Sequence, residues 1–381
     1  MTQLFPSPVF TSFGPSRFGS AAEPPCCHRV EASRSRGLRA QVRRDASRGP
    51  GVYGMLDRDG ELVYVGKAKS LRSRLLSYFR RRSRDPKAGR ILSRTRTLVW
   101  EPAANEFAAL LRELELIQRW RPRFNVFGQP RHGRLAFVCL GRSPAPYLFL
   151  TRQIPRPCVA VCGPVRSRRV IQEAIRFLND FFKLRDCPSR VPMVFANAKA
   201  LFSEPLTPGC LRLDVGACTG PCAAACTERE YGRQVRAAAG FLNGGDSHVI
   251  EHLEQEMATA SKEQAFERAA GLRDRLQAIL HLQAAVDRVR QAQELPPRMY
   301  ECGVGPRDVV WHLLQRGRVA ATFARPQSAA EHEATMRSAR GLLRSLPRHT
   351  PVAAEELDEV LLVNGWFRKH PEELECVWEV G

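Results

Sequence analysis

Two short apolar runs joined by a turn, with an amphipathic helix after them, constrain the first ordered part of this chain most strongly. The runs are Gly51–Leu56 and Glu61–Val65, and Asp57–Gly60 between them is rich in turn-forming residues. From about Ala104 to Trp120, apolar residues recur at intervals of three and four, which predicts a helix. The residues with this spacing are Phe107, Leu110, Leu111, Leu114 and Ile117. A hairpin and a helix of this kind predict a small α/β domain.

The charge of the chain points to a polyanionic partner. Of 381 residues, 59 are Lys or Arg and 39 are Asp or Glu, which gives a net charge of +20. The length predicts two or three domains. No stretch approaches the roughly 18 consecutive apolar residues of a membrane span, and the first 30 residues lack the apolar core of a signal peptide. We therefore expect a cytoplasmic protein whose 12 cysteines are reduced.

Two tyrosines and a run of basic residues suggest a phosphate site. If the turn is centred on Arg58–Asp59, Tyr53 faces Tyr64 directly, on the same side of the sheet, and a bulge at Gly60 would shift the register by one residue. Between Lys67 and Arg96 there are 12 basic residues and one acid. We expect a basic helix from Ser70 to about Arg82. The ordinary alternatives are that the two tyrosines are a packed aromatic pair and that the basic helix is merely solvated. Positive charges this dense repel one another, which favours binding of the segment to phosphates.

Glu113 is a candidate metal ligand. It lies beside the apolar stripe of the predicted helix, three residues after Leu110 and four before Ile117. A partly desolvated carboxylate of this kind suits a hard divalent cation. The alternative is a surface glutamate paired with Arg112 or Arg119.

A cysteine cluster follows in the middle of the chain. Cys187, Cys210, Cys218 and Cys222 fall within 36 residues, and Cys226 comes four residues later. Four thiolates bind either tetrahedral zinc or an iron–sulfur cluster. Buried free thiols are the alternative, and we expect them for Cys26, Cys27, Cys139, Cys158, Cys162, Cys302 and Cys376.

Residues 244–295 predict a helical hairpin with its connection near Lys262–Gln264. Its apolar stripes are formed by Leu253, Met257, Ala260, Phe266, Ala269, Ala270, Leu276 and Leu280. Two helices bury such stripes poorly by themselves, so the hairpin either binds a partner helix pair or packs within this chain.

The ordered motifs of the first domain resemble the GIY-YIG nuclease domain of the UvrC excinuclease family. The matching segments are Gly51-Val-Tyr53, Tyr64-Val-Gly-Lys-Ala-Lys69, Leu71-Arg-Ser-Arg74, Ser77-Tyr-Phe79, Glu113 and Arg121-Pro-Arg-Phe-Asn125, with Phe124 where the family commonly has tyrosine. The resemblance implies a metal-dependent phosphodiesterase.

The resemblance also implies roles for the site residues. Tyr64 would help to deprotonate the attacking water, and Lys67 would lower the pKa of Tyr64. Arg74 would stabilise charge on the phosphorus, and Glu113 would hold Mg²⁺ or Mn²⁺. Tyr53 and Asn125 would order the site. The residues expected to contact DNA are Lys69, Arg72, Arg80, Arg81, Arg82 and Arg84.

Two later segments are similar to the same family. The cysteine segment resembles one that binds a [4Fe-4S] cluster, which implies Cys187, Cys210, Cys218 and Cys222 as ligands, with Cys226 as a substitute and zinc as the alternative metal. The segment Phe266–Asp274 resembles the UVR motif that docks on UvrB. The partner-binding residues implied there are Phe266, Ala270, Arg273 and Asp274.

The last 80 residues resemble the family less well. We expect strands near Val309–Leu313 and Val319–Phe323, a helix at 329–346 and a strand at Val360–Val363. This pattern suggests a degenerate, incomplete RNase H-like fold, with Asn364 where the family has its first catalytic aspartate.

The chain is thus predicted to be an α/β multi-domain protein. Its parts are a disordered tail at 1–35 (or a transit segment), a GIY-YIG domain at 36–128, a middle domain at 129–243, the hairpin at 244–295 and the degenerate segment at 296–381. The function implied is a single incision of damaged double-stranded DNA, 3′ to the lesion, in nucleotide excision repair with UvrB. The alternatives are a GIY-YIG nuclease with another role and a catalytically silent UvrB-binding scaffold.

Overall fold

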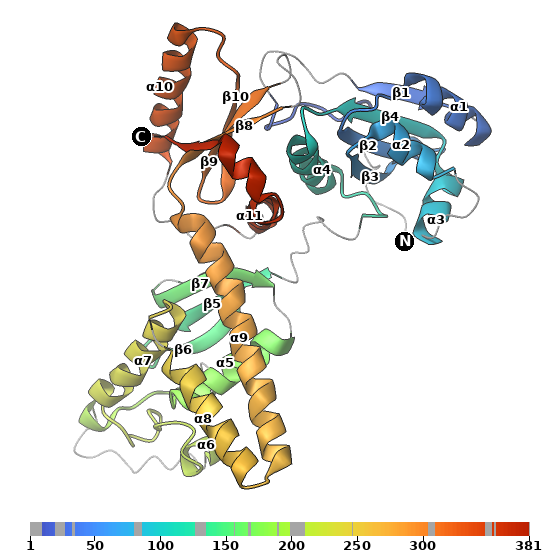
Figure 1. Ribbon diagram of the computed structural model, residues 1–381. Coiled ribbons are helices and arrows are strands. Elements are labelled where there is room, and N and C mark those ends of the chain that lie inside the picture. Colours follow the sequence, from blue (N-terminus) through green and yellow to red (C-terminus); the bar gives the residue numbers. More distant parts are fainter. Residues whose placement is uncertain are drawn as a thin grey trace. The chain divides into compact units, whose positions relative to one another are not determined.

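The computed structural model describes residues 10–19, 27–32, 35–79, 86–125, 135–155, 157–166, 169–188, 190–198, 210–245, 247–303, 309–346, 353 and 356–380. The five expected segments group into two compact units (Figure 1). The first combines Met1–Pro130 with Ala292–Arg348 and Asp358–Gly381, and the second combines Arg131–Gln291 with His349–Leu357. Among the described residues, no helix is long and apolar enough to cross a membrane.

The first unit contains the predicted α/β domain. Its antiparallel sheet has the strand order β1-β4-β2-β3, so that β3 is an edge strand. The strands are β1 (His28–Glu31), β2 (Gly51–Leu56), β3 (Leu62–Ala68) and β4 (Thr97–Pro102). The helices are α1 (Ser35–Asp45), α2 (Leu71–Ser77), α3 (Pro86–Arg94) and α4 (Glu106–Trp120).

Alternation along β2 explains how the sheet is covered on both faces. Tyr53 and Met55 belong to a core shared with α1, α2 and α3, whereas Val52 and Leu56 belong to a core shared with α4. Successive strand residues point to opposite faces, so this continuous apolar run is what a doubly covered strand requires. The sheet therefore lies between α4 and the three other helices.

The hairpin register differs from the expected one. Tyr53 pairs with Gly66 and Tyr64 pairs with Met55, two positions from the expected register, and an irregularity between Met55 and Leu56 accounts for one of the two. Tyr53 and Tyr64 are therefore diagonal neighbours. They lie on the same face, as expected, with ring centroids 6.1 Å apart.

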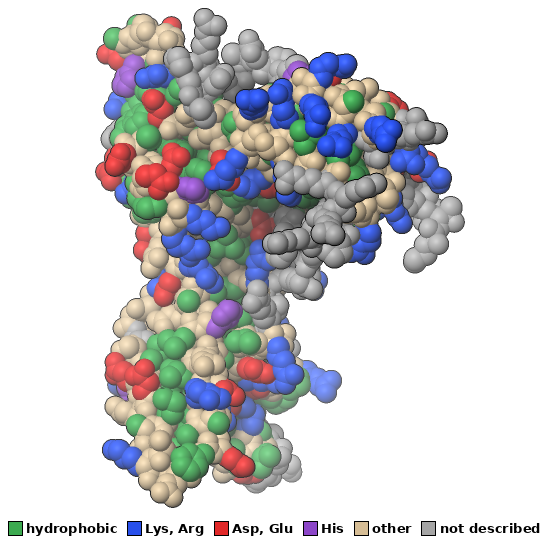
Figure 2. Space-filling model, turned by 45° about the vertical axis from the view of Figure 1, so that its right-hand side comes forward, with side chains coloured by type: hydrophobic (Ala, Val, Ile, Leu, Met, Phe, Trp, Pro, Cys, Tyr) green, Lys and Arg blue, Asp and Glu red, His purple; other side chains and the backbone are tan. Residues whose placement is uncertain are grey.

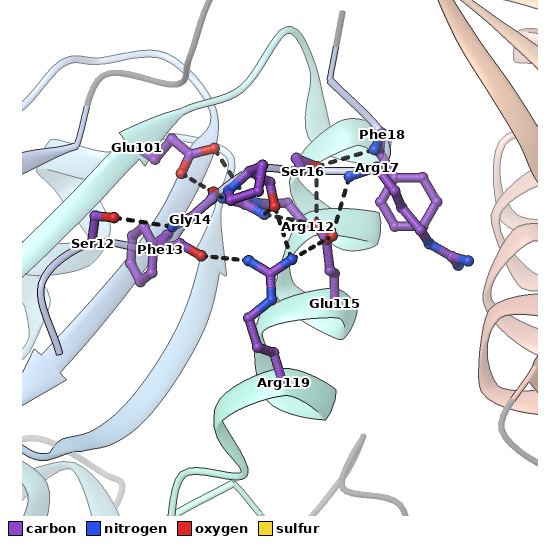
Figure 3. A network of polar contacts seen from close by, with 11 residues as sticks. Ser12, Phe13, Gly14, Ser16, Arg17, Phe18, Glu101, Arg112, Glu115 and Arg119 are labelled. Atoms are coloured by element: carbon purple, nitrogen blue, oxygen red, sulfur yellow. Dashed lines mark hydrogen bonds and ion pairs between the residues drawn. The ribbon is translucent and has the colours of Figure 1, made fainter. Parts of the chain in front are cut away.

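The expectation of a disordered tail over residues 1–35 is wrong for the described parts. Phe10 and Phe13 are buried against α4, and β1 pairs with β4. Arg119 Nη1 donates to the Phe13 carbonyl at 2.6 Å, and Arg112 Nη2 donates to that of Gly14 at 2.6 Å (Figure 3). A segment without helical or strand periodicity is ordered here because its carbonyl groups and aromatic rings have partners on α4.

The C-terminal part of the first unit is a second antiparallel sheet of order β10-β9-β8-β11. Its strands are β8 (Arg298–Cys302), β9 (Val310–Gln315), β10 (Arg318–Ala324) and β11 (Val377–Glu379). α10 (Ala329–Ser345) packs on one face. α11 (Leu357–Lys369) packs on the other, followed by the 3-10 turns Pro371–Cys376. Phe107 of α4 joins this second core, 5.1 Å from the ring of Tyr300.

The strand expected at Val360–Val363 is wrong, because these residues lie within α11. Val360, Val363 and Trp366 are buried at intervals of three, which is helical spacing. A short apolar run does not by itself distinguish a strand from a buried helix. Asn364 therefore does not occupy a strand position, and the RNase H-like interpretation stays a prediction.

The second unit has a three-stranded sheet of order β6-β5-β7. Its strands are β5 (Leu135–Gly141), β6 (Tyr147–Thr151) and β7 (Cys158–Arg166). Helices α5 (Arg169–Phe181), α7 (Glu228–Leu242), α8 (His248–Lys262) and α9 (Phe266–Glu294) share one core with it. The short α6 (Leu211–Asp214) and the 3-10 turn Ala196–Ala198 lie in the cysteine-containing segment.

The helical hairpin, α8 and α9, packs partly within its own unit. Leu253, Ala260 and Leu276 are buried in the core of the second unit. Phe266 and Leu280, by contrast, are 69% and 43% exposed. One apolar stripe of the hairpin is thus buried in the core of its own unit, whereas the side chains of Phe266 and Leu280 remain at the surface.

Candidate active site

The predicted catalytic residues come together at the edge strand β3. Tyr64 and Lys67 belong to β3, Tyr53 to the neighbouring β2, Arg74 to α2 and Glu113 to α4. α2 and α4 both pack against β3. An edge strand has no further strand beside it, so side chains from the two faces of the sheet meet at its open side.

Tyr53 is the centre of a hydrogen-bonded group. Its ring is fully buried, its hydroxyl lies 2.9 Å from that of Tyr78, and Arg74 Nε donates to it at 3.1 Å. The guanidinium of Arg74 also lies over the Tyr78 ring, 5.2 Å from its centroid. Tyr78 was quoted in the sequence motif without a role. Its place four residues after Arg74, one helical turn on, is the signal that predicts the contact.

Gly66 makes room for this tyrosine. A Cβ atom at Gly66 would lie 2.6 Å from the Tyr53 hydroxyl oxygen and 2.7 Å from the ring carbon that bears it. The residue is therefore glycine because the Tyr53 ring crosses the backbone of β3 there.

We expect Gly66→Ala to reduce incision and to lower the free energy of unfolding. The methyl group would push the Tyr53 ring away from Arg74, and overpacking of this kind costs about 1–3 kcal/mol. Urea unfolding and a nicking assay measure the two effects. Gly49→Ala is the control, since no atom lies within 4 Å of its new methyl. A Gly66→Ala protein as stable and active as this control would contradict the assignment.

Glu113 is partly buried and has an altered acidity. Burial raises the pKa of its carboxyl to about 7, although the backbone N–H of Lys67 and the charges of Lys67 and Arg74 oppose the rise. The proposed pairing with Arg112 or Arg119 is not what the structure shows. Both arginines bind Glu115 instead, at 2.7 and 3.1 Å.

Lys67 forms an ion pair with a second glutamate of α4. Its Nζ lies 2.6 Å from Oε1 of Glu106, a residue that the sequence interpretation gave no role. The pKa of Tyr64 is raised well above its ordinary value, mainly by burial and then by Tyr78, with Glu113 adding to the rise. In this state Tyr64 keeps its proton at neutral pH, and a lowering of its pKa by Lys67 stays a prediction.

Asn125 holds β3 in place from the loop after α4. Its Oδ1 accepts from the backbone N–H of Val65 at 2.9 Å, and its Nδ2 donates to the carbonyl of Val65 at 2.8 Å. The side-chain amide thus replaces a neighbouring strand at the sheet edge, next to Tyr64. This geometry suits the ordering role implied by the resemblance.

A buried ion-pair network fixes α4, which carries Glu113. Arg112 is 3% exposed and donates to both carboxylate oxygens of Glu101 on β4, at 3.2 Å each. It also binds Glu115 on its own helix at 2.7 Å. Glu115 in turn accepts from Ser16 and from the backbone of Arg17 (Figure 3). The helix is thereby tied to the sheet and to the N-terminal segment.

The predicted DNA-binding residues are described only in part. Lys69 is exposed and lies 2.8 Å from Oε2 of Glu106. Arg72 is half-buried and donates from Nε to the carbonyl of Ala46 at 2.7 Å, which makes it a link between α1 and α2. Arg80, Arg81, Arg82 and Arg84 lie outside the described residues.

Thiols of the cysteine segment influence one another electrostatically. Neighbouring thiols affect the pKa values of Cys218 and Cys222, which are raised mainly by burial: Cys187 acts on both, Cys222 on Cys218, and Cys210 on Cys222. Cys226 interacts with Thr219 and Glu230 instead. Cys187, unlike Cys226, is thus among the thiols that influence Cys218 and Cys222, and the choice of the fourth ligand stays a prediction. Among the described residues, however, no group of three or more His, Cys, Asp or Glu is arranged as a metal-binding group.

The residues expected to bind a partner occupy the start of α9. Phe266 is the most exposed large apolar residue of the hairpin. Arg273 and Asp274 are exposed and lie 3.1 Å apart, while Ala270 is half-buried. Arg268, beside them, binds Glu256 of α8 at 2.6 Å and closes the hairpin.

Family models match three segments of the chain. Residues 49–126 match the UvrC-like GIY-YIG domain, residues 136–241 the middle domain of the UvrC/Cho excinuclease, and residues 248–281 the UvrB/UvrC motif. The three matches follow the order expected from the sequence.

Curated relatives show the same relationship. The UvrABC system protein C of Pseudomonas aeruginosa (strain LESB58) is 32% identical over 326 residues, which cover 85% of this chain and 48% of the relative. That of Ectopseudomonas mendocina (strain ymp) is 33% identical over 268 residues, 70% of this chain and 40% of the relative. The chain thus spans less than half the length of these relatives.

A solved structure is also similar in sequence. It is the GIY-YIG N-terminal endonuclease domain of UvrC from Thermotoga maritima, bound to magnesium as its catalytic divalent cation. It is 35% identical, and the match covers 23% of this chain and 96% of that domain, with a TM-score of 0.22.

Proposed function

Since this chain belongs to the UvrC family over its GIY-YIG, middle and UvrB/UvrC-motif segments, we propose that it is a metal-dependent endonuclease of nucleotide excision repair in the cytosol. The observation that carries the proposal is the grouping of Tyr53, Tyr64, Arg74 and Glu113 at the β3 edge. A scaffold without activity has no need of a partly buried carboxylate beside a tyrosine and an arginine.

The donor set at this edge fits a single Mg²⁺ or Mn²⁺. Mg²⁺ keeps most of its waters and is commonly bound through one or two carboxylates, which is what Glu113 provides. When bound, the cation supplies the charge that lowers the pKa of the attacking water. The charge of Glu113 raises the pKa of Tyr64, so a cation bound to Glu113 would reduce that rise. Tyr64 would act as a base only as the phenolate, after losing its own proton to solvent, and would then accept a proton from the water; Arg74 would stabilise the charge that develops on the phosphate.

We propose further that the protein makes one incision, 3′ to the lesion. The described residues assemble one site of this kind, and among them no cluster of three or more His, Cys, Asp or Glu is arranged to hold a metal ion. Two-metal hydrolysis needs such a cluster. A single site on one face of the DNA predicts a single product.

A duplex with one bulky adduct, labelled at both ends of the damaged strand, tests the function. We expect one nick on the 3′ side that requires Mg²⁺ or Mn²⁺ and is stimulated by UvrB. No nick under any of these conditions would favour the silent scaffold, and nicking that ignores both the adduct and UvrB would favour another GIY-YIG role. A second nick on the 5′ side would contradict the single incision.

We propose that UvrB binds the exposed surface of α9 at Phe266, Arg273 and Asp274. A phenyl ring that is 69% exposed, two helical turns before the exposed pair Arg273–Asp274, offers an apolar anchor with charged side chains on the same helix. In the nicking assay, Phe266→Ala should abolish the stimulation by UvrB and keep the basal rate. Leu280→Ala, at an exposed apolar position on the same helix, is the control.

We propose a [4Fe-4S] cluster on Cys187, Cys210, Cys218 and Cys222, with zinc as the alternative. The donor types fit, and the mutual influence of these thiols supports their proximity. The cluster would link the short α6 to the end of the loop after α5.

Anaerobically purified protein is expected to be brown and to contain about four irons per chain. Cys218→Ala should remove the colour, because a ligand is lost. Cys226→Ala should keep it, because Cys226 interacts with Thr219 and Glu230 rather than with the other thiols. Iron analysis and visible absorption measure both. Colourless protein with stoichiometric zinc would favour the alternative, and bleaching by Cys226→Ala would exclude the proposed ligand set.

A further inference from the structure

α1, which precedes the segment matched by the GIY-YIG family model, presents arginines on one face only. Leu38, Val42 and Ala46 are fully buried at intervals of four. The opposite face exposes Arg36, Arg39 and Arg43, at intervals of three and four. The helix therefore has an apolar side held by the protein and a cationic side in solvent; we call Arg36, Arg39 and Arg43 the α1 ridge.

The charge of the α1 ridge is uncompensated within the described part of the chain. Its three arginines form no ion pair there, and the single acid of the helix, Asp45, binds Arg44 at 2.7 Å. Figure 2 shows Lys and Arg side chains gathered over the part of the first unit that holds β1 to α4. Like charges this close repel one another and gain from an external polyanion.

Direct contacts join α1 to the candidate active site. Arg72, in the first turn of α2, donates from its backbone to Ser47 at 2.9 Å and from Nε to Ala46 at 2.7 Å, just after α1 ends. Two residues further along α2, Arg74 Nε donates to the Tyr53 hydroxyl. The α1 ridge thus belongs to the same packed layer as the residues that would meet the phosphate.

The ordinary alternative is a solvated basic helix, and α10 shows what one looks like. Arg337, Arg340 and Arg344 repeat the same three- and four-residue intervals on an exposed face. α10 also carries Glu331 and Glu333, however, so its surface is of mixed sign. α1 differs because Asp45 is its one acid beside four arginines, and because it packs next to the candidate active site.

We propose that the α1 ridge binds phosphates of duplex DNA on the side of α2, extending the DNA-contact surface beyond residues 49–126. From Arg36 to Arg43 the α1 ridge extends about 10 Å along the helix axis, which corresponds to about three phosphates of one strand at about 3.4 Å of DNA axis each. Contacts of this kind carry no base sequence information. The inference rests on the proposed function in taking DNA as the polyanion.

The test compares Arg36→Gln/Arg39→Gln/Arg43→Gln with Arg337→Gln/Arg340→Gln/Arg344→Gln in the full chain. Both remove three charges with the same spacing. Affinity for an undamaged duplex is measured by fluorescence anisotropy in EDTA over a range of salt concentrations. We expect the slope of log affinity against log salt to become shallower by about 2.7 for the α1 variant, at 0.9 per phosphate contact, and to stay unchanged for the α10 variant.

Because EDTA excludes incision, this result is independent of whether the chain cuts DNA. Equal slopes for the wild type and the α1 variant would overturn the inference. An equal decrease of the slope in the α1 and α10 variants would also overturn the inference, since the change in net charge alone would explain it. If the α1 variant unfolds, Arg39→Gln alone should shift the slope by about 0.9, and the triple change to Lys should retain it; failure of either outcome counts against the α1 ridge.

Discussion

Glu113→Gln is expected to lower the rate of incision on the order of 10³-fold while leaving affinity for DNA in EDTA unchanged. The carboxylate is the donor we assign to the divalent cation, whereas the basic residues supply ground-state affinity. Single-turnover nicking at saturating protein, with a titration of Mg²⁺ and Mn²⁺, measures the effect. Glu61→Gln, at an exposed position of the β2–β3 turn, is the control. Robust nicking by Glu113→Gln at any metal concentration would contradict the assignment.

The pKa of Glu113 gives this site a specific pH dependence. A carboxyl with a pKa of about 7 is increasingly protonated as the pH falls below 7. Protons then compete with the cation, so the apparent affinity for Mg²⁺ should fall between pH 8 and pH 6. The stability of the metal-free protein should change with pH in the opposite direction, falling as the pH rises. The raised pKa means that ionising Glu113 destabilises the fold as the pH rises from about 4.5 to 7.

Urea unfolding of metal-free protein checks this sign. Glu113→Gln should be more stable than the wild type at pH 8, where the wild-type carboxylate is ionised and partly buried. The difference should vanish near pH 4, where both side chains are neutral. Equal stabilities at pH 8 would mean that burial does not raise this pKa.

Arg112→Met is expected to lower the free energy of unfolding by about 3–5 kcal/mol. The guanidinium is 3% exposed, and its removal leaves Glu101 on β4 without its bidentate partner and takes one of the two cations from Glu115. The backbone carbonyls of Gly14 and Pro15 lose a donor as well. Urea unfolding followed by tryptophan fluorescence measures the change.

Arg44→Met provides the matched comparison within the same unit. Arg44 binds Asp45 at 2.7 Å, but its side chain is 76% exposed. Solvent screens an exposed pair of this kind, so it adds little to stability, and this variant should be nearly as stable as the wild type. The double variant Glu101→Gln/Arg112→Met should recover part of the loss, because one buried charge is removed. An Arg112→Met protein no less stable than Arg44→Met would show that the network does not hold α4.

The β2–β3 hairpin and α4 show what local pattern predicts well. The apolar run Gly51–Leu56 is a strand with those bounds, and the period of Phe107, Leu111 and Ile117 predicts α4 within two residues at its start. Both signals depend on neighbours in sequence, through the alternation of a strand and the turn of a helix. The register of the hairpin was not predictable in the same way, because the irregularity at Leu56 depends on how the strands meet.

Val360–Val363 and the N-terminal segment show where local pattern fails. Four apolar residues suit a strand or a buried helix, and only packing on the second sheet decides for α11. Residues 10–19 have no period to detect. Their order comes from Arg112 and Arg119 of α4, about 100 positions away in sequence.

The sequence by itself determined the chemistry of this protein: which tyrosines, arginine, glutamate and cysteines are present, and the order of motifs that relates the chain to UvrC proteins. Only the tertiary structure decided their states. It engaged Lys67 with Glu106, raised the pKa of Glu113 to about 7 and that of Tyr64 above its ordinary value, and set Tyr78 and Arg74 around Tyr53. The reason is that burial and charge act between atoms that are close in space, whereas residue types and their spacing can be read along the chain.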